Sequence, residues 1–65
     1  MKIYLFNDDE LFNYRIDATS YRHAIALFKD LFRVQGRLRL TARYANVKEY
    51  KLDKSSYKFS IREMQ

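Results

Sequence analysis

One stretch of this 65-residue chain has the apolar spacing of an α-helix, whereas almost all of the rest alternates as β-strands do. A hydroxyl pair, Thr19-Ser20, precedes this stretch and can cap a helix N-terminus. Gly36, the only glycine, follows it where a left-handed C′ residue is common. We therefore expect a helix from residue 21 to about residue 34 or 35. Its one buried stripe consists of residues spaced three, four, seven, ten and eleven positions after the first: Tyr21, Ala24, Ile25, Phe28, Leu31 and Phe32.

The N-terminal segment has the pattern of a β-hairpin. Residues 2–6 and 11–18 favour strands, and Asn7-Asp8-Asp9-Glu10 between them is typical of a turn. With a loop of these four residues, Phe6 lies opposite Leu11, and Tyr4 shares the side of Phe6. The other side, which we expect to face the helix, then carries Ile3, Leu5, Phe12, Tyr14 and Ile16.

Three further strands are predicted after the helix. In residues 37–44, one side carries Leu38, Leu40, Ala42 and Tyr44, and the other carries Arg37, Arg39, Thr41 and Arg43. Strands at 47–52 and 57–62, joined by the loop 53–56, place Leu52 opposite Tyr57 and Tyr50 opposite Phe59, all facing the core. For Tyr50 to share a side with Leu40, the preceding connection needs an odd number of residues, as in 45–47, or a β-bulge.

The chain is therefore predicted to form one α+β domain over residues 1–65, in the order β-β-α-β-β-β. A five-stranded antiparallel sheet carries the helix on one face and leaves the other face open. We expect the spatial strand order 2-1-3-4-5, since the helix returns the chain to the side of the first strand. The absence of cysteine favours a reducing cytoplasm, and no apolar stretch reaches the roughly 18 residues of a membrane span.

Positive charge is concentrated in the second half of the chain. The net charge is +5, and residues 31–65 hold nine Lys or Arg against three Asp or Glu. A sheet face that carries this positive charge can bind phosphates or carboxylates. Outward strand positions are also commonly charged for solubility, and Tyr4 and Phe6 can either stack on bases or lie buried in a second small cluster. The residues expected to form a binding surface on the open face are Arg37, Arg39, Arg43, Lys51, Lys58, Arg62, Arg15, Tyr4 and Phe6.

Nothing in the sequence favours an enzyme. His23 is the only histidine and has no cysteine or clustered carboxylate in its neighbourhood of the sequence, so neither a zinc site nor a catalytic triad is indicated. The acidic run 8–10 lacks the ligand spacing of a calcium loop. Ser20 serves best as a helix cap. We expect neither a catalytic site nor a cofactor.

One segment resembles a known family. The stretch Tyr14-Arg15-Ile16-Asp17-Ala18-Thr19-Ser20, Ala24 in the helix, Gly36 and Leu38-Arg39-Leu40 resemble a segment of small phage anti-CRISPR proteins that inhibit type I-F effectors. Those proteins use a hairpin, one helix and a three-stranded meander. The resemblance covers about residues 12–40, and it implies a binding protein that docks on a host nucleoprotein complex. This chain lacks a glycine-bearing turn in its meander, so no functional residue is carried over.

Two other functions remain open from the sequence. A stand-alone binder of RNA or single-stranded DNA would use the same basic face, with affinity that falls steeply as salt rises. A structural or self-associating module would pair through an exposed strand edge, and we expect the chain to be a monomer or a homodimer. In each case the expected partner is an acidic protein surface, a nucleic acid or a second copy, and the expected location is the cytoplasm, that of the host cell if the protein comes from a phage.

Overall fold

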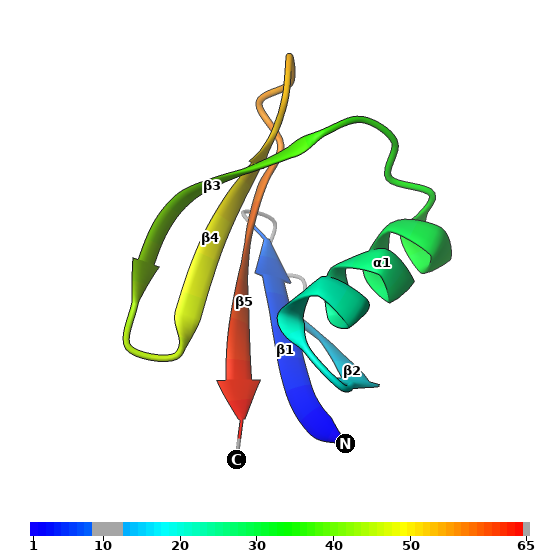
Figure 1. Cartoon of the computed structure of the whole chain (residues 1–65). Coiled ribbons are helices and arrows are strands. Elements are labelled where there is room, and N and C mark those ends of the chain that lie inside the picture. Colours follow the sequence, from blue (N-terminus) through cyan, green and yellow to red (C-terminus); the bar gives the residue numbers. More distant parts are fainter. Residues whose placement is uncertain (9–12, 65) are drawn as a thin grey trace.

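The computed structural model describes residues 1–8 and 13–64 and has five strands and one helix (Figure 1). The helix lies across one face of a single antiparallel sheet, and the other face carries no helix. The predicted α+β class and order of elements are confirmed. The elements are β1 (Lys2–Asp8), β2 (Asn13–Ala18), α1 (Tyr21–Phe32), β3 (Leu38–Tyr44), β4 (Val47–Leu52) and β5 (Lys58–Met64).

The strands lie in the order β2-β1-β5-β4-β3, so the expected order 2-1-3-4-5 is wrong. β5, not β3, pairs with β1, and β3 forms an edge that Figure 1 shows far from β2. The reason is apolar content on the helix side. β1 and β5 contribute the buried pairs Tyr4 with Phe6 and Phe59 with Ile61, so these two strands occupy the middle of the sheet beneath α1. β3 contributes fewer buried residues and lies at the edge.

The β1–β2 hairpin has a different register from the predicted one. Phe6 pairs with Tyr14 and Tyr4 with Ile16, which is a shift of three positions from a pairing of Phe6 with Leu11. A shift by an odd number of residues moves every side chain to the opposite face. Tyr4 and Phe6 therefore point toward the helix. The predicted turn overlaps residues 9–12, and the predictions for Leu11 and Phe12 lie outside the described residues.

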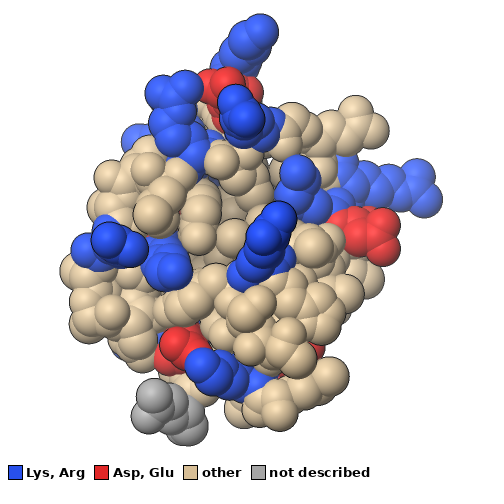
Figure 2. All heavy atoms as spheres, in the orientation of Figure 1, with Lys and Arg blue, Asp and Glu red and all other residues tan. Residues whose placement is uncertain are grey.

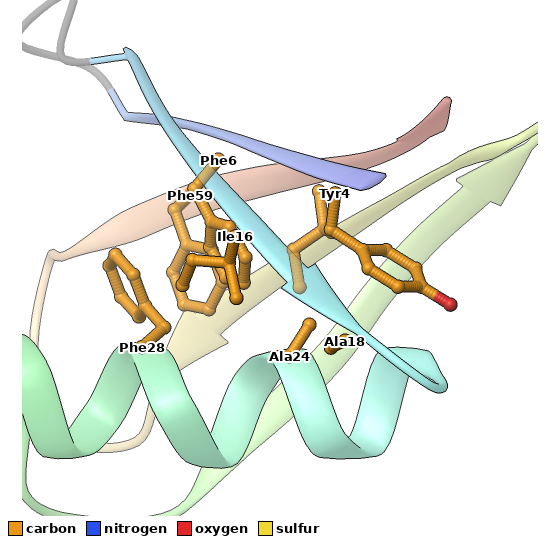
Figure 3. Packing of buried hydrophobic residues seen from close by; sticks show 8 residues of the cluster. Tyr4, Phe6, Ile16, Ala18, Ala24, Phe28 and Phe59 are labelled. Atoms are coloured by element: carbon orange, nitrogen blue, oxygen red, sulfur yellow. The ribbon is translucent and has the colours of Figure 1, made fainter. Parts of the chain in front are cut away.

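An aromatic cluster forms the centre of the core (Figure 3). The ring of Phe6 stacks on that of Phe28 with centroids 4.5 Å apart, and Phe59 lies 5.0 Å from Phe28 and 5.8 Å from Phe6. Tyr4 and Phe6 are each only 1% exposed. Their predicted place on the open face is wrong, and so is the alternative of a separate small cluster, because both belong to the main core.

The helix begins as predicted and ends early. The Ser20 hydroxyl accepts a hydrogen bond from the His23 backbone N–H at 3.1 Å, which confirms the N-cap. The left-handed residue at the C-terminus is Arg33 (φ 53°), where Gly36 was expected. Gly36 also has positive φ (104°), and a Cβ there would lie 3.2 Å from Leu52 Cδ1, so the glycine serves the loop after the helix. Leu31 is 58% exposed and does not belong to the buried stripe.

The meander contains a β-bulge, one of the two predicted solutions. Tyr44 pairs with Val47 across a two-residue turn, and the register shifts between Leu40 and Ala42, leaving Thr41 as the extra residue. Beyond the bulge the faces reverse, so Ala42 and Tyr44 leave the helix side where they were predicted to lie. The predicted β4–β5 register is confirmed by the pairs Tyr50 with Phe59 and Lys51 with Lys58. Among the described residues, no helix is long and apolar enough to span a membrane.

Candidate binding face

The open face is the side of the sheet that α1 does not cover. Three of its cations lie side by side on adjacent strands, because Lys51 of β4 is directly opposite both Arg39 of β3 and Lys58 of β5. We call these three residues the basic row. Directly opposed side chains have Cβ atoms only about 5 Å apart, and like charges at this distance destabilise the sheet. An anionic partner would remove this repulsion.

One carboxylate partly neutralises the basic row. Asp53 Oδ1 accepts a hydrogen bond from Arg39 Nη2 at 3.1 Å, and the Asp53 backbone N–H donates to the Arg37 carbonyl at 2.8 Å. Within the described part of the chain, Lys51 and Lys58 form no ion pair. Arg37 continues the ladder of β3 at the same end of the sheet. This end of the open face is therefore strongly positive.

Two other predicted cations lie on the open face away from the basic row. Arg15, on the edge strand β2, forms an ion pair with Asp17 at 3.1 Å. Arg62 pairs with Val47 and Leu5 and lies four residues along β5 from Lys58. Four residues of a strand span about 13 Å, so Arg62 does not extend the basic row. Figure 2 shows the Lys and Arg side chains at several separate places on the visible side of the molecule.

Arg43 does not share the open face with Arg39, and its predicted place there is wrong. The bulge at Thr41 reverses the alternation, and Arg43 pairs with Lys48, whose other neighbour is the buried Ile61. The Lys48 ammonium lies 4.1 Å from the ring centroid of Tyr21 on α1, which is a cation–π contact on the helix side. A bulge in this strand could be anticipated only from the requirement that Leu40 and Tyr50 face the same core.

A polar hollow that no sequence pattern indicated lies beside the basic row. Its volume is about 180 Å³. Tyr44 donates a hydrogen bond from its hydroxyl to Glu49 Oε1 at 3.2 Å, and this bond raises the pKa of Tyr44 above its ordinary value. Thr41 donates from Oγ1 to the Glu49 carbonyl at 3.3 Å. The hollow is lined by Asn7, Asp8, Thr41, Glu49, Tyr50, Lys58, Phe59 and Ser60.

Apolar side chains surround Arg62 at the far end of the open face. Ile3 of β1 pairs with Met64 of β5, and Leu5 lies beside Ile3 on the same face. Val47 is buried although it is not part of the main core, and Tyr44, which pairs with it, is 56% exposed. We call Ile3, Leu5, Tyr44 and Met64 the apolar patch. With Tyr4 and Phe6 in the core, Tyr44 is the one aromatic side chain that the described strands place on this face.

The remaining candidate groups have structural contacts. His23 Nδ1 accepts a hydrogen bond from the Thr19 backbone N–H at 3.2 Å, so this histidine ties the segment before the helix to its first turn. Glu63 forms an ion pair with Lys2 at 2.9 Å and receives the hydroxyl of Tyr4 at 3.5 Å, which connects β1 to β5. In residues 1–8 and 13–64, no three His, Cys, Asp or Glu side chains are grouped so that they could hold a metal ion.

Comparison of the chain with known protein families, with curated proteins and with solved structures finds no match. The indications of a partner come from the open face itself.

Proposed function

We propose that this is a non-enzymatic binding protein that docks through its open face on an acidic patch of another protein. The observation that carries the proposal is the direct opposition of Lys51 and Lys58 with no acidic side chain between them. The folded chain tolerates this repulsion in its own sheet. A carboxylate of a partner placed between the two ammonium groups would turn it into attraction, with charge-assisted hydrogen bonds.

The composition of the open face favours a protein partner over a nucleic acid. Protein interfaces combine an apolar centre with polar and charged surroundings, whereas nucleic-acid interfaces are more uniformly basic. Here the basic row adjoins Glu49 of the polar hollow, and the apolar patch completes the face. Glu49 would repel a continuous phosphate backbone. The two aromatic residues considered for base stacking are buried, which removes the main support for a single-stranded ligand.

The likeness to anti-CRISPR proteins suggests which acidic protein this is. Proteins of that kind dock on host complexes that handle nucleic acid, and we extend this to the present chain as part of the proposal. The acidic patch would then belong to a protein subunit of a CRISPR effector-like complex. Its support is the sequence likeness over about residues 12–40, together with a basic face whose row residues come from β3, β4 and β5.

Direct binding of RNA or single-stranded DNA is the second candidate, and the basic row itself favours it. Three adjacent cations can follow a phosphate backbone, and affinity would then come from counterion release and fall steeply with salt. The same three residues would carry the binding. A nucleic-acid ligand and an acidic protein ligand can therefore be separated by competition and by salt.

The test uses fluorescence anisotropy with a labelled hexaglutamate peptide and a labelled thymidine oligonucleotide as probes. A double variant, Lys51→Gln with Lys58→Gln, is compared with Arg22→Gln with Arg33→Gln, which removes the same charge from exposed helix-side positions. Exposed charge pairs contribute about 0.2–1 kcal/mol each, so loss of two should weaken hexaglutamate binding by the first variant about twofold to thirtyfold. The second should change little. Equal losses in both variants would contradict docking through the open face, and tighter, salt-sensitive oligonucleotide binding would favour the second candidate.

A further inference from the structure

The polar hollow adjoins the basic row, and together they specify more than an acidic partner. We propose that the hollow receives an arginine side chain of the partner while the basic row holds a carboxylate of the same segment. This inference rests on the proposed function, because it describes the partner of the same face. The ligand is then a protein segment of mixed charge, with an acidic and a basic residue on one side.

The lining of the hollow is rich in hydrogen-bond acceptors. Glu49 contributes a carboxylate, Asn7 an amide oxygen, and Thr41 and Ser60 hydroxyl groups, while Lys58 is the one cation among the described lining residues. Asp8 pairs with Phe59, so its side chain points to the helix side. A guanidinium group has five N–H donors and no acceptor, so it matches such a lining better than a phosphate or a carboxylate does. The Glu49 carboxylate supplies the negative charge that pairs with a guanidinium group.

The size of the hollow agrees with this occupant. A volume of about 10–15 Å³ on the same measure suffices for one water molecule, and the hollow offers about 180 Å³. A planar guanidinium with the end of its stem fits in that space. The Tyr44 hydroxyl already holds Oε1 of Glu49 at 3.2 Å, which fixes the carboxylate in place before a ligand arrives. Because the Glu49 carboxylate is already held in place, it loses less conformational entropy on binding a ligand than a freely rotating carboxylate would.

The spacing of the two sites defines the segment. Glu49 and Lys51 are two residues apart on β4, and Ser60 and Lys58 are two residues apart on β5. Two residues of a strand span about 6.6–6.8 Å, and side chains two apart lie on the same face. An extended partner segment with Asp and Arg at positions i and i+2 therefore reaches the basic row and the hollow at once.

The test compares two peptides, Ac-Ser-Asp-Ser-Arg-Ser-NH₂ and the same peptide with citrulline for arginine, which keeps the shape and removes the charge. Both are titrated into the ¹⁵N-labelled full chain and followed by amide chemical shifts. The arginine peptide should bind several-fold more tightly, with its additional shifts at Asn7, Thr41 and Ser60. Glu49→Gln should reduce this preference to near parity, because the amide keeps the acceptor for Tyr44 and loses the charge. Asp30→Asn, an exposed helix position, is the matched control and should keep the preference.

The outcomes separate this inference from the proposed function. If both peptides bind equally to the wild-type chain, and Lys51→Gln with Lys58→Gln weakens both, the hollow does not receive the arginine and the inference is overturned. If the arginine preference persists in Glu49→Gln, the inference is likewise overturned. If the basic-row variant binds both peptides as well as the wild type does, the proposed function itself fails. Circular dichroism of each variant establishes that it is folded.

Discussion

β1 and β3 are strands of seven residues each with opposite fates in the sheet; residues 3–6 of β1 are all apolar, whereas apolar and polar residues alternate in β3. β1 has neighbours on both sides, and its Tyr4 and Phe6 lie in the core under α1. β3 pairs only with β4, contains the bulge at Thr41 and leaves Leu40 43% exposed. An edge strand can accept an extra residue because only one ladder is interrupted. The position of a strand in the sheet, more than its alternation, decides which of its residues are buried.

The largest expected effect is a loss of stability when a buried residue of β1 is truncated. Phe6→Ala removes a ring that stacks on both Phe28 and Phe59 and should lower the free energy of unfolding by about 3–5 kcal/mol. Leu40→Ala on β3 should cost less than about 1 kcal/mol. Urea denaturation followed by circular dichroism measures both. A domain of this size has little stability to lose, so Phe6→Leu supplies a folded intermediate case. Equal costs at the two strands would contradict the contrast.

The sequence predicted the features that depend on neighbouring residues. The N-cap at Ser20, the helix period as far as Phe28 and the β4–β5 register all follow from short-range spacing and are confirmed, whereas Leu31 of the predicted stripe is exposed. The order of strands depended on which strands share the core, and local alternation does not contain that information. The predicted hairpin register is wrong because it was derived from an assumed loop length. The observed register is the one that packs Tyr4 and Phe6 into the aromatic core with Phe28.

The candidate site was predictable only where the strand was regular. Three predicted cations lie on the open face as expected: Arg39, Lys51 and Lys58. The β4–β5 pairing is regular throughout, and β3 alternates without interruption up to Leu40. Arg43 lies beyond the bulge and was therefore assigned to the wrong face. The polar hollow arises from residues of β1, β3, β4 and β5 together. No single segment carries the signal for it.

A smaller effect concerns pH and the buried tyrosine of β1. Burial raises the pKa of Tyr4 above its ordinary value near 10, and the charge of Glu63 raises it further. Above pH 10 the unfolded chain loses this phenolic proton more readily than the folded chain does, so stability falls as pH rises. Tyr4→Phe should lose less stability than the wild type between pH 9 and pH 11. Urea midpoints at the two pH values test this, and equal losses would contradict it.

The smallest expected effect lies in the basic row itself. Lys51→Gln removes the repulsion with Arg39 and Lys58 and should raise the free energy of unfolding by a few tenths of a kcal/mol. Arg22→Gln, at an exposed position of α1 away from the basic row, should leave it unchanged at the same net charge. Thermal melts at low salt measure the difference. It should shrink at high salt, and a destabilised Lys51→Gln would contradict the assigned repulsion.

The most direct test of the central claim is a map of where an acidic ligand binds. The ¹⁵N-labelled chain is titrated with hexaglutamate, and amide shifts are followed over the whole described sheet and helix. Docking through the open face predicts the largest changes at Arg39, Lys51 and Lys58, with little change around Arg22 on α1. Shifts centred on the helix, or spread evenly over all the lysines and arginines, would contradict it.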